Sequence, residues 1–222
     1  SKHKISKKIT PHSAGELDNG KIVWITAHVN ESVDLFNGQD QINSYLLFVI
    51  YHIYGKSISI SYLPSIMRCS NVIRKMLGAR SRKELEYRIN HRATFDPEIA
   101  AKTLNLVSQS LTEYADLAEY LGSKRFTNDT LQQFLKQVFP TQSNDTDVLS
   151  RSSKTIIKIL DEMPNADVKK GSWWAALNAI TYYTNHVHGK TQNKRWESLI
   201  EGTSRAKNTR AFELAQEYAE MA

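Results

Sequence analysis

The chain has 222 residues, 41% of them hydrophobic, which is enough to bury the core of one large domain or of two small ones. Its 29 Lys and Arg residues exceed its 23 Asp and Glu residues, and the net charge of +6, with a pI of about 9.3, favours an anionic partner. The single cysteine excludes an internal disulfide framework, and because no apolar run reaches about 18 residues we expect no membrane-spanning helix.

Residues 1–20 are predicted to form a basic, flexible arm. They are polar and contain Pro11, Gly15 and Gly20, and they begin with a Lys-rich stretch that lacks both a Met and the apolar centre of a signal peptide. We therefore expect a fragment or a processed product. Such an arm can lie along phosphate groups or be a solvated terminus, and both alternatives stay open.

Three strands are expected next. Ile22 to Val29 alternates in polarity and predicts a first strand, followed by a loop from Asn30 to Asp40. Tyr45 to Tyr54 is a nearly unbroken apolar and aromatic run, typical of a strand covered on both faces. After a turn at Gly55-Lys56, serines alternate with apolar residues from Ser57 to Tyr62, which predicts a strand with one solvated face. The pair therefore forms a β-hairpin.

The strands are expected to pack against a helix. Pro64 interrupts the third strand, bulges it or places it at a sheet edge, before Ile66 to Cys69 resumes it. Ser70 or Asn71 then caps a helix that ends at Gly78. The strand-strand-strand-helix order over residues 21–93 predicts an α+β fold with a small antiparallel sheet, and one more short strand is possible within Glu84 to His91.

Residues 94–222 are predicted to be mostly helical and to pack on this core as part of one domain. Asp96 and Pro97 open a long helix whose apolar residues recur every three or four positions up to Gly122. Shorter helices are predicted around Leu131 to Val138 and from Val148 to Met163.

The last section combines aromatic, polar and basic residues. From Ser172 to His188 a helix is predicted, with Trp173 in its buried stripe and Trp174 partly exposed on a polar and aromatic flank that could hold a base or form a polar core. A basic, Gly-containing connection leads to a final helix with Arg205 and Lys207 near its start. Cations there oppose the helix dipole unless an anion lies nearby.

Cationic residues concentrate between Arg68 and Arg92, where eight Lys or Arg residues face two Glu residues. Clustered cations and neighbouring aromatic rings are what a protein needs to follow a single-stranded phosphate backbone, although a solvated basic surface has the same composition. The candidate DNA-binding residues are Arg68, Arg74, Lys75, Arg80, Arg82, Lys83, Arg88, His91, Arg92, Trp174, Lys190, Lys194, Arg195, Arg205 and Lys207.

The spacing of reactive residues gives little support to an enzyme. His186 and His188 are two apart and point to different sides of a helix, whereas histidines that share a metal are three or four apart or come from separate segments. Cys69 with His91 or His52 could act as nucleophile and base, but a lone cysteine after a strand is more often a buried apolar residue. We expect no cofactor, no metal and no catalytic residue.

Six blocks of the sequence carry a family resemblance: KIVWITAHV, GQDQINSYLLFVIYH, PSIMRCSNVI, INHR, WWAALNAITYYTNHV and RWESLIEGTSRAKNTRAFELA. Together they resemble domain of unknown function 932, a family of phage and plasmid-like proteins, over roughly residues 20 to 217. The chain departs from the family at His52 to Gly55, where members have a His-Asp-Gly-like turn, and at Asn185, where they commonly have Asp. The matching positions are Trp24, Asp40, Tyr45, Arg68, Cys69, Asn71, His91, Asn178, Tyr183, His186, Arg195, Gly202 and Lys207.

A second resemblance concerns topology. Three antiparallel strands followed by helices, in a basic phage-type protein, are similar to the single-strand annealing recombinases of the RecT, Redβ and Erf type. This similarity implies a protein of the host cytoplasm that lays single-stranded DNA in a basic groove and assembles into homo-oligomeric rings or filaments. Two alternatives are a non-enzymatic interaction protein, such as a host-defence inhibitor or a phage assembly factor, and a metal-dependent nuclease.

The basic cluster generates a first prediction. If these cations follow a phosphate backbone, the triple variant Arg80→Ala, Arg82→Ala, Lys83→Ala loses about three phosphate contacts, each of which contributes roughly 0.7 to the slope of log affinity against log salt on single strands. The slope should fall by about two units, nearly independently of base sequence. Binding isotherms at several salt concentrations measure it, and an unchanged slope would identify these charges as a solvated surface.

Overall fold

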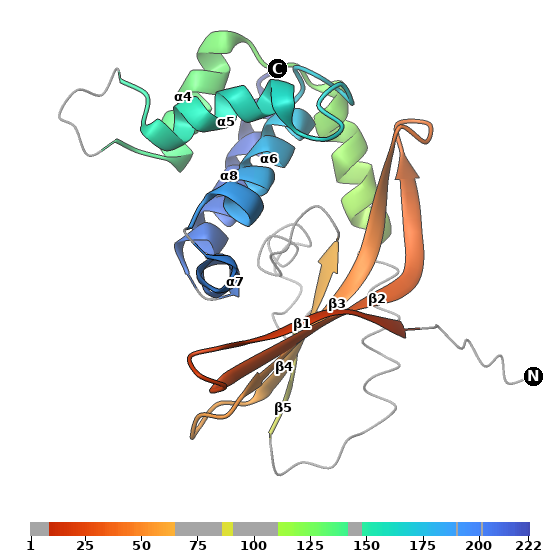
Figure 1. Ribbon diagram of the computed structural model, residues 1–222. Coiled ribbons are helices and arrows are strands. Elements are labelled where there is room, and N and C mark those ends of the chain that lie inside the picture. The colour runs from red at the N-terminus through yellow and green to blue at the C-terminus, as the bar shows by residue number, and fades with distance from the viewer. Residues whose placement is uncertain (1–8, 65–85, 91–110, 142–147, 190, 201) are drawn as a thin grey trace, which may run out of the picture.

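The computed structural model describes residues 9–64, 86–90, 111–141, 148–189, 191–200 and 202–222. An antiparallel sheet is followed by a group of helices, which confirms the predicted α+β fold (Figure 1). The sheet has five strands in the order β1-β2-β3-β4-β5, namely β1 (Ile9–Leu17), β2 (Ile22–Leu35), β3 (Asp40–Tyr51), β4 (Ile58–Pro64) and β5 (Glu86–Ile89). After a helical segment over residues 111–123 come α4 (Asn128–Val138), α5 (Arg151–Glu162), α6 (Trp173–Tyr182), the π-helical turn η1 (Tyr183–Val187), α7 (Gln192–Ile200) and α8 (Thr203–Glu220).

The prediction of a flexible arm is wrong for residues 9–17, which form β1. This strand pairs with β2 along its whole length, with a register shift between Pro11 and Ser13. Its side chains are mostly exposed, so the sequence has the polar composition of a loop, and β1 is an edge of the described sheet. A proline and a register shift are devices that edge strands tolerate.

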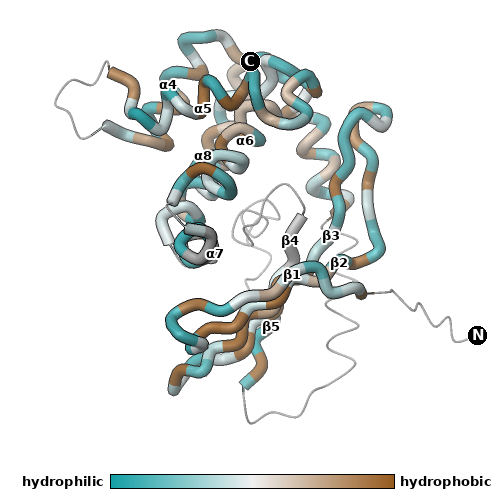
Figure 2. Tube along the Cα trace, in the orientation of Figure 1, coloured by the Kyte–Doolittle hydropathy of each residue, from teal (hydrophilic) through white to brown (hydrophobic). Residues whose placement is uncertain are grey.

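The predicted loop from Asn30 to Asp40 is also wrong. The strand β2 continues to Leu35 after a register shift between Val29 and Ser32, and β3 begins at Asp40. This far half of the hairpin projects from the sheet toward the helices, and Figure 2 shows that its residues are largely hydrophilic. Its polar side chains explain why it resembles a loop in the sequence.

The β3–β4 hairpin and the short strand β5 confirm the predictions made for these segments. The connecting turn contains Gly55, whose φ of +78° is readily adopted by glycine. The face of β4 that was expected to be solvated is covered, however, since Ser59 and Ser61 are 7% and 4% exposed. β4 ends at Pro64, and the predicted segments from Ile66 to Gly78 and from Asp96 to residue 110 lie outside the described residues.

Hydrophobic residues are buried on both faces of the sheet. One face carries a small cluster made of Leu17, Trp24, Leu47 and Val49. The other face contributes Val29, Ile42, Leu46 and Ile60 to a large cluster that also contains the buried residues of the helices. The sheet and the helices therefore share one main core.

Three of the helices, α4, α5 and α6, begin at a Ser or Thr residue that caps the helix N-terminus. The side chains of Thr127, Ser150 and Ser172 accept hydrogen bonds from backbone N–H groups three residues further on, at 3.2, 3.2 and 3.3 Å. α4, α5, α6 and α8 confirm predicted helices, and residues 111–123 confirm the described end of the long helix, although Val148 is exposed and precedes α5. α7 was not predicted, because its basic sequence has the composition of a connection.

The prediction that Trp174 is partly exposed is wrong, whereas Trp173 is buried as predicted. Both rings are 1% exposed or less, because α6 is covered on two sides. The ring of Trp173 packs against Phe134 and Tyr218 of α4 and α8, with centroids 5.2 Å away in each case. The Trp174 ring instead contacts Phe36 at the hairpin tip and Tyr114 of the helix over residues 111–123.

The tip of the β2–β3 hairpin is inserted among the helices. Phe36, at φ +52°, is 4% exposed and lies edge-on to Trp174 with ring centroids 6.2 Å apart. Its backbone N–H donates to the Glu119 carboxylate, and Trp174 Nε1 donates to Asp40 Oδ2 at 3.4 Å. A Cβ on Gly122 would collide with the Phe36 ring, so the glycine allows this close approach.

These contacts predict that Phe36 and Trp174 stabilise the fold jointly. Phe36→Ala and Trp174→Ala should each reduce the free energy of unfolding by about 3 to 5 kcal/mol, the range for large aromatic residues in a core. The double variant should lose less than the sum, by about 0.5 to 3 kcal/mol, because the two rings touch. Urea unfolding measures all three, and Tyr54→Ala is the control, since this fully exposed residue should change stability by no more than about 0.5 kcal/mol. Strict additivity would contradict the proposed coupling.

Candidate nucleic-acid interface

The structure describes six of the predicted DNA-binding residues. Arg88 is exposed on β5, and Trp174 is fully buried, so its ring offers no face on which a base could stack. Lys194 and Arg195 lie on α7, while Arg205 and Lys207 lie in the first two turns of α8. The others lie outside the described residues: Arg68, Arg74, Lys75, Arg80, Arg82, Lys83, His91, Arg92 and Lys190.

The four helical cations belong to one structural unit, which we call the α7–α8 corner (residues 191–200 and 202–210). Lys194 is exposed, and the Arg195 guanidinium donates to the Gly189 carbonyl oxygen at 3.0 Å, which fixes the entry to α7. Lys207 places its ammonium group 4.9 Å from the centroid of the Phe139 ring. Over residues 190–210 the sequence has six Lys or Arg and two Glu residues, an excess of four positive charges.

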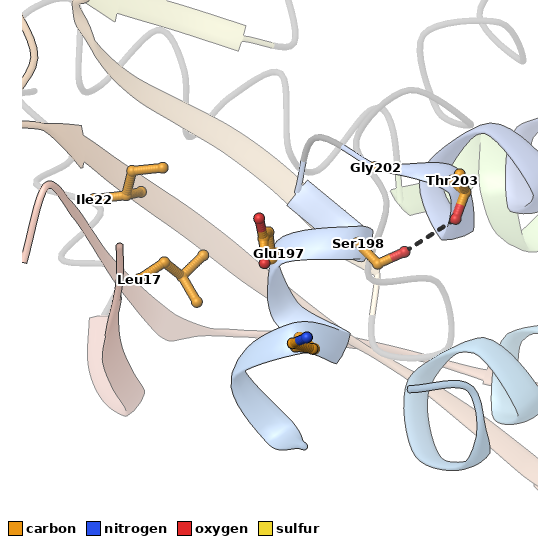
Figure 3. A pocket seen from close by; sticks show the side chains of 7 residues that line it. Leu17, Ile22, Glu197, Ser198, Gly202 and Thr203 are labelled. Atoms are coloured by element: carbon orange, nitrogen blue, oxygen red, sulfur yellow. Dashed lines mark hydrogen bonds between the residues drawn. The ribbon is translucent and has the colours of Figure 1, made fainter. Parts of the chain in front are cut away.

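A cleft of about 400 Å³ separates the α7–α8 corner from the end of the β1–β2 hairpin. The sheet contributes an apolar wall of Leu17 and Ile22, and the corner contributes Lys194, Glu197, Ser198, Gly202 and Thr203 (Figure 3). The volume falls within the range of small-molecule sites, and the lining combines an apolar wall with a few polar groups. The cleft therefore has room for a small, partly apolar group beside polar side chains.

The junction between α7 and α8 determines one side of this cleft. Gly202 is the N-cap of α8 and has no side chain to offer, so Ser198 of the preceding helix takes the capping role: its hydroxyl accepts from Ser204 N at 3.1 Å. A Cβ on Gly202 would lie 2.7 Å from the Ser198 Cα, so the two helices can meet this closely only at glycine. The first turn of α8 contains no acidic residue.

Two buried threonines, Thr181 of α6 and Thr184 of η1, make polar contacts, and Thr184 reaches α8. The Thr184 hydroxyl donates to Asn208 Oδ1 at 3.0 Å, and both residues are fully buried. Thr181 is also buried, and its hydroxyl donates to the Asn178 carbonyl oxygen at 2.9 Å. Of the two interpretations of the polar flank, the polar core applies to Thr181. The Thr184–Asn208 bond ties this segment to the first half of α8, which carries Arg205 and Lys207.

A second polar group lies beside the corner, around η1. Tyr183 is buried, and its hydroxyl lies 2.8 Å from Ser152 Oγ and 3.5 Å from His188 Nδ1. Burial, followed by the charge of Lys207, lowers the pKa of His188 below its usual value. Neither Ser152 nor Ser198 was singled out in the sequence, because a serine that caps a neighbouring helix or contacts a tyrosine hydroxyl carries no periodic or motif signal.

The family model for domain of unknown function 932 matches residues 4–217, and the chain belongs to this family. The match spans the sheet, the cleft and the whole α7–α8 corner. No curated protein matches the chain, and no solved structure matches it. The family description assigns no activity.

The described part of the chain has neither a metal-binding cluster nor a membrane-spanning helix. No three His, Cys, Asp or Glu side chains of those residues lie together as a metal ion would require. No helix within the same residues combines the length and apolar character needed to cross a membrane.

The lowered pKa of His188 generates a prediction about pH. The imidazole of His188 takes up a proton more readily in the unfolded chain than in the folded chain. Protonation of His188 therefore does not lower the free energy of unfolding above the unfolded pKa of about 6.5. As the pH falls from that value toward the folded pKa, protonation increasingly lowers the free energy of unfolding. His188→Gln should therefore flatten the decline in the free energy of unfolding between about pH 7 and pH 5.

Urea unfolding at a series of pH values measures this difference. The matched control is His52→Gln, which introduces the same side chain at an exposed turn. If wild type and His188→Gln declined in parallel, the lowered pKa of His188 would be contradicted.

Proposed function

We propose that this protein binds single-stranded DNA and promotes strand annealing in phage or plasmid recombination, acting in the host cytoplasm as a homo-oligomer. The observation that carries the proposal is the α7–α8 corner, where Lys194 lines a cleft with an apolar wall and Arg195, Arg205 and Lys207 lie on the same two helices. Cations that neutralise phosphates release counterions, and this supplies most of the sequence-independent affinity for nucleic acid. Family membership is compatible with the proposal but assigns no activity.

The cleft favours single strands over duplex. In a duplex the bases are stacked and paired, so a base can enter a closed site only after it has been unpaired and extruded. A cleft of about 400 Å³ with Leu17 and Ile22 on one wall can accept a single base, while Lys194 on the opposite side contacts the backbone. Apolar and aromatic contacts to bases are tolerant of sequence, which an annealing protein requires.

The edges of the sheet provide a route to oligomers. β1 covers β2, so the first strand predicted from the sequence is not an edge; within the described sheet the outer strands are β1 and β5. An edge strand presents unpaired backbone groups that another chain can pair with. We propose that copies of the protein assemble along the bound DNA strand by pairing these sheet edges.

The proposal predicts how the salt dependence of DNA binding changes when two lysines are replaced by the uncharged glutamine. Lys194→Gln with Lys207→Gln should lower the slope of log affinity against log salt on a single-stranded oligonucleotide by about 1.4, since each phosphate contact contributes roughly 0.7. The control is Lys154→Gln with Lys158→Gln, which removes two exposed charges of α5, outside the α7–α8 corner. Fluorescence anisotropy at several salt concentrations gives the slopes.

Equal slopes in the corner variant and in the control would overturn the assignment of the interface. If the wild-type protein bound neither single strands nor duplex, the interaction-protein alternative would replace the proposal. Cleavage of the oligonucleotide with added Mg²⁺ would favour the nuclease alternative. Annealing itself is measured with complementary labelled strands, and light scattering with bound oligonucleotide tests the oligomer, because a strict monomer would contradict rings and filaments.

A further inference from the structure

The π-helical turn η1 brings together two side chains that a regular helix would separate. The backbone N–H of His188 donates to the Tyr183 carbonyl oxygen five residues earlier, at 2.8 Å. In an α-helix, residues five apart lie roughly 140° apart around the axis. Here the Tyr183 and His188 rings are 5.6 Å apart between centroids, on the same side of the chain. The turn ends the helix, because His188 has an extended backbone (φ −72°, ψ 121°).

The Tyr183 hydroxyl connects α5 to the imidazole. It lies 2.8 Å from Ser152 Oγ and 3.5 Å from His188 Nδ1, and two proton arrangements satisfy both contacts. In one of them Ser152 donates to the Tyr183 oxygen and Tyr183 donates to Nδ1. The imidazole proton then lies on Nε2, where it can donate to a ligand.

Lys207 brings a positive charge to the same place. Its ammonium group lies over the Phe139 ring, and Phe139 packs edge-on against Tyr183 with centroids 5.8 Å apart. Ser152, His188 and Lys207 are each partly exposed around the buried tyrosine, so their donor groups are accessible to solvent. Ser152 also lies in the first turn of α5, whose dipole favours a negative charge nearby.

The set consists of donors and one permanent cation, with no acidic member. We propose that Ser152, Tyr183, His188 and Lys207 form a binding site for a phosphate oxyanion, with the His188 Nε2–H and the Lys207 ammonium group as its two principal donors. That the phosphate belongs to a DNA backbone rests on the proposed function. The site adjoins the α7–α8 corner, because Gly189, which follows His188, accepts the hydrogen bond from Arg195.

The site makes a prediction about the titration of His188. The titratable or charged groups around it are Tyr183 on its own turn and Lys207 on α8, with Arg195 of α7 held at Gly189. Both its burial and Lys207 disfavour the imidazolium. A bound phosphate supplies an opposite charge, so it should raise the pKa of His188.

The experiment follows the imidazole nitrogens of the ¹⁵N-labelled protein by nuclear magnetic resonance. Inorganic phosphate is titrated against sodium chloride of equal ionic strength, and a single-stranded oligonucleotide is titrated separately. We expect His188 to be the Nε2–H tautomer, and phosphate to shift its resonances and raise its pKa while chloride does neither. Tyr183→Phe keeps the ring contacts and should weaken phosphate binding by about three- to tenfold, the effect of one hydrogen bond. His52, exposed in the β3–β4 turn, reports non-specific effects in the same spectra.

The outcomes separate this site from the proposed function. If phosphate affected His188 and His52 alike, or if Tyr183→Phe bound phosphate as well as wild type did, the site would be overturned even when DNA binding is intact. If phosphate moved His188 selectively and no oligonucleotide bound, the site would stand and the DNA-binding proposal would fall. Unfolding of Tyr183→Phe is checked by its far-ultraviolet circular dichroism, and Ser152→Ala provides a second variant with the same expected loss.

Discussion

The insertion of Phe36 between helices is the contact on which the arrangement of the molecule depends. A hairpin that projects from a sheet would be costly to order on its own, because its far half buries little apolar surface. Here Phe36 and Trp174 bury each other, and the Asp40 carboxylate accepts the indole N–H that burial would otherwise leave unpaired. The sheet is thereby fixed to α6, and through the polar core of Thr184 and Asn208 α6 is fixed to α8.

This chain of contacts determines the position of the cleft. Its apolar wall belongs to the β1–β2 hairpin and its polar wall to the α7–α8 corner, two segments that are far apart in the sequence. Few direct contacts join α7 to β1, so the separation of the walls follows from the hairpin tip on one side and from the α6–α8 packing on the other. Replacing Phe36 should therefore change the distance between the two walls of the cleft, although Phe36 itself does not line the cleft.

Periodicity and capping residues were enough to predict the α+β order, the β3–β4 hairpin, the helical residues 111–123 and the helices α4, α5, α6 and α8, since each of these has a local signal. The sequence pattern was misleading where tertiary contacts, and not local composition, decide which residues are buried. β1 and the far half of the β2–β3 hairpin are polar because they are exposed, and Ser59 and Ser61 are polar although they are buried. Trp174 was placed on the wrong side because a helix covered on two faces has no exposed stripe. The cations could be found by counting, but the cleft could not, since its walls meet only through long-range packing.

The two polar surfaces of the helical region share a physical origin. At the α7–α8 junction Gly202 removes a side chain so that Ser198 can cap the next helix, and at η1 one π-turn rotates His188 toward Tyr183. Ser204 N in the first turn of α8 is occupied by Ser198, whereas His188 is partly exposed beside Lys207. Arg205 lies in the first turn of α8 and opposes the helix dipole, so an anion bound near it would reduce that repulsion.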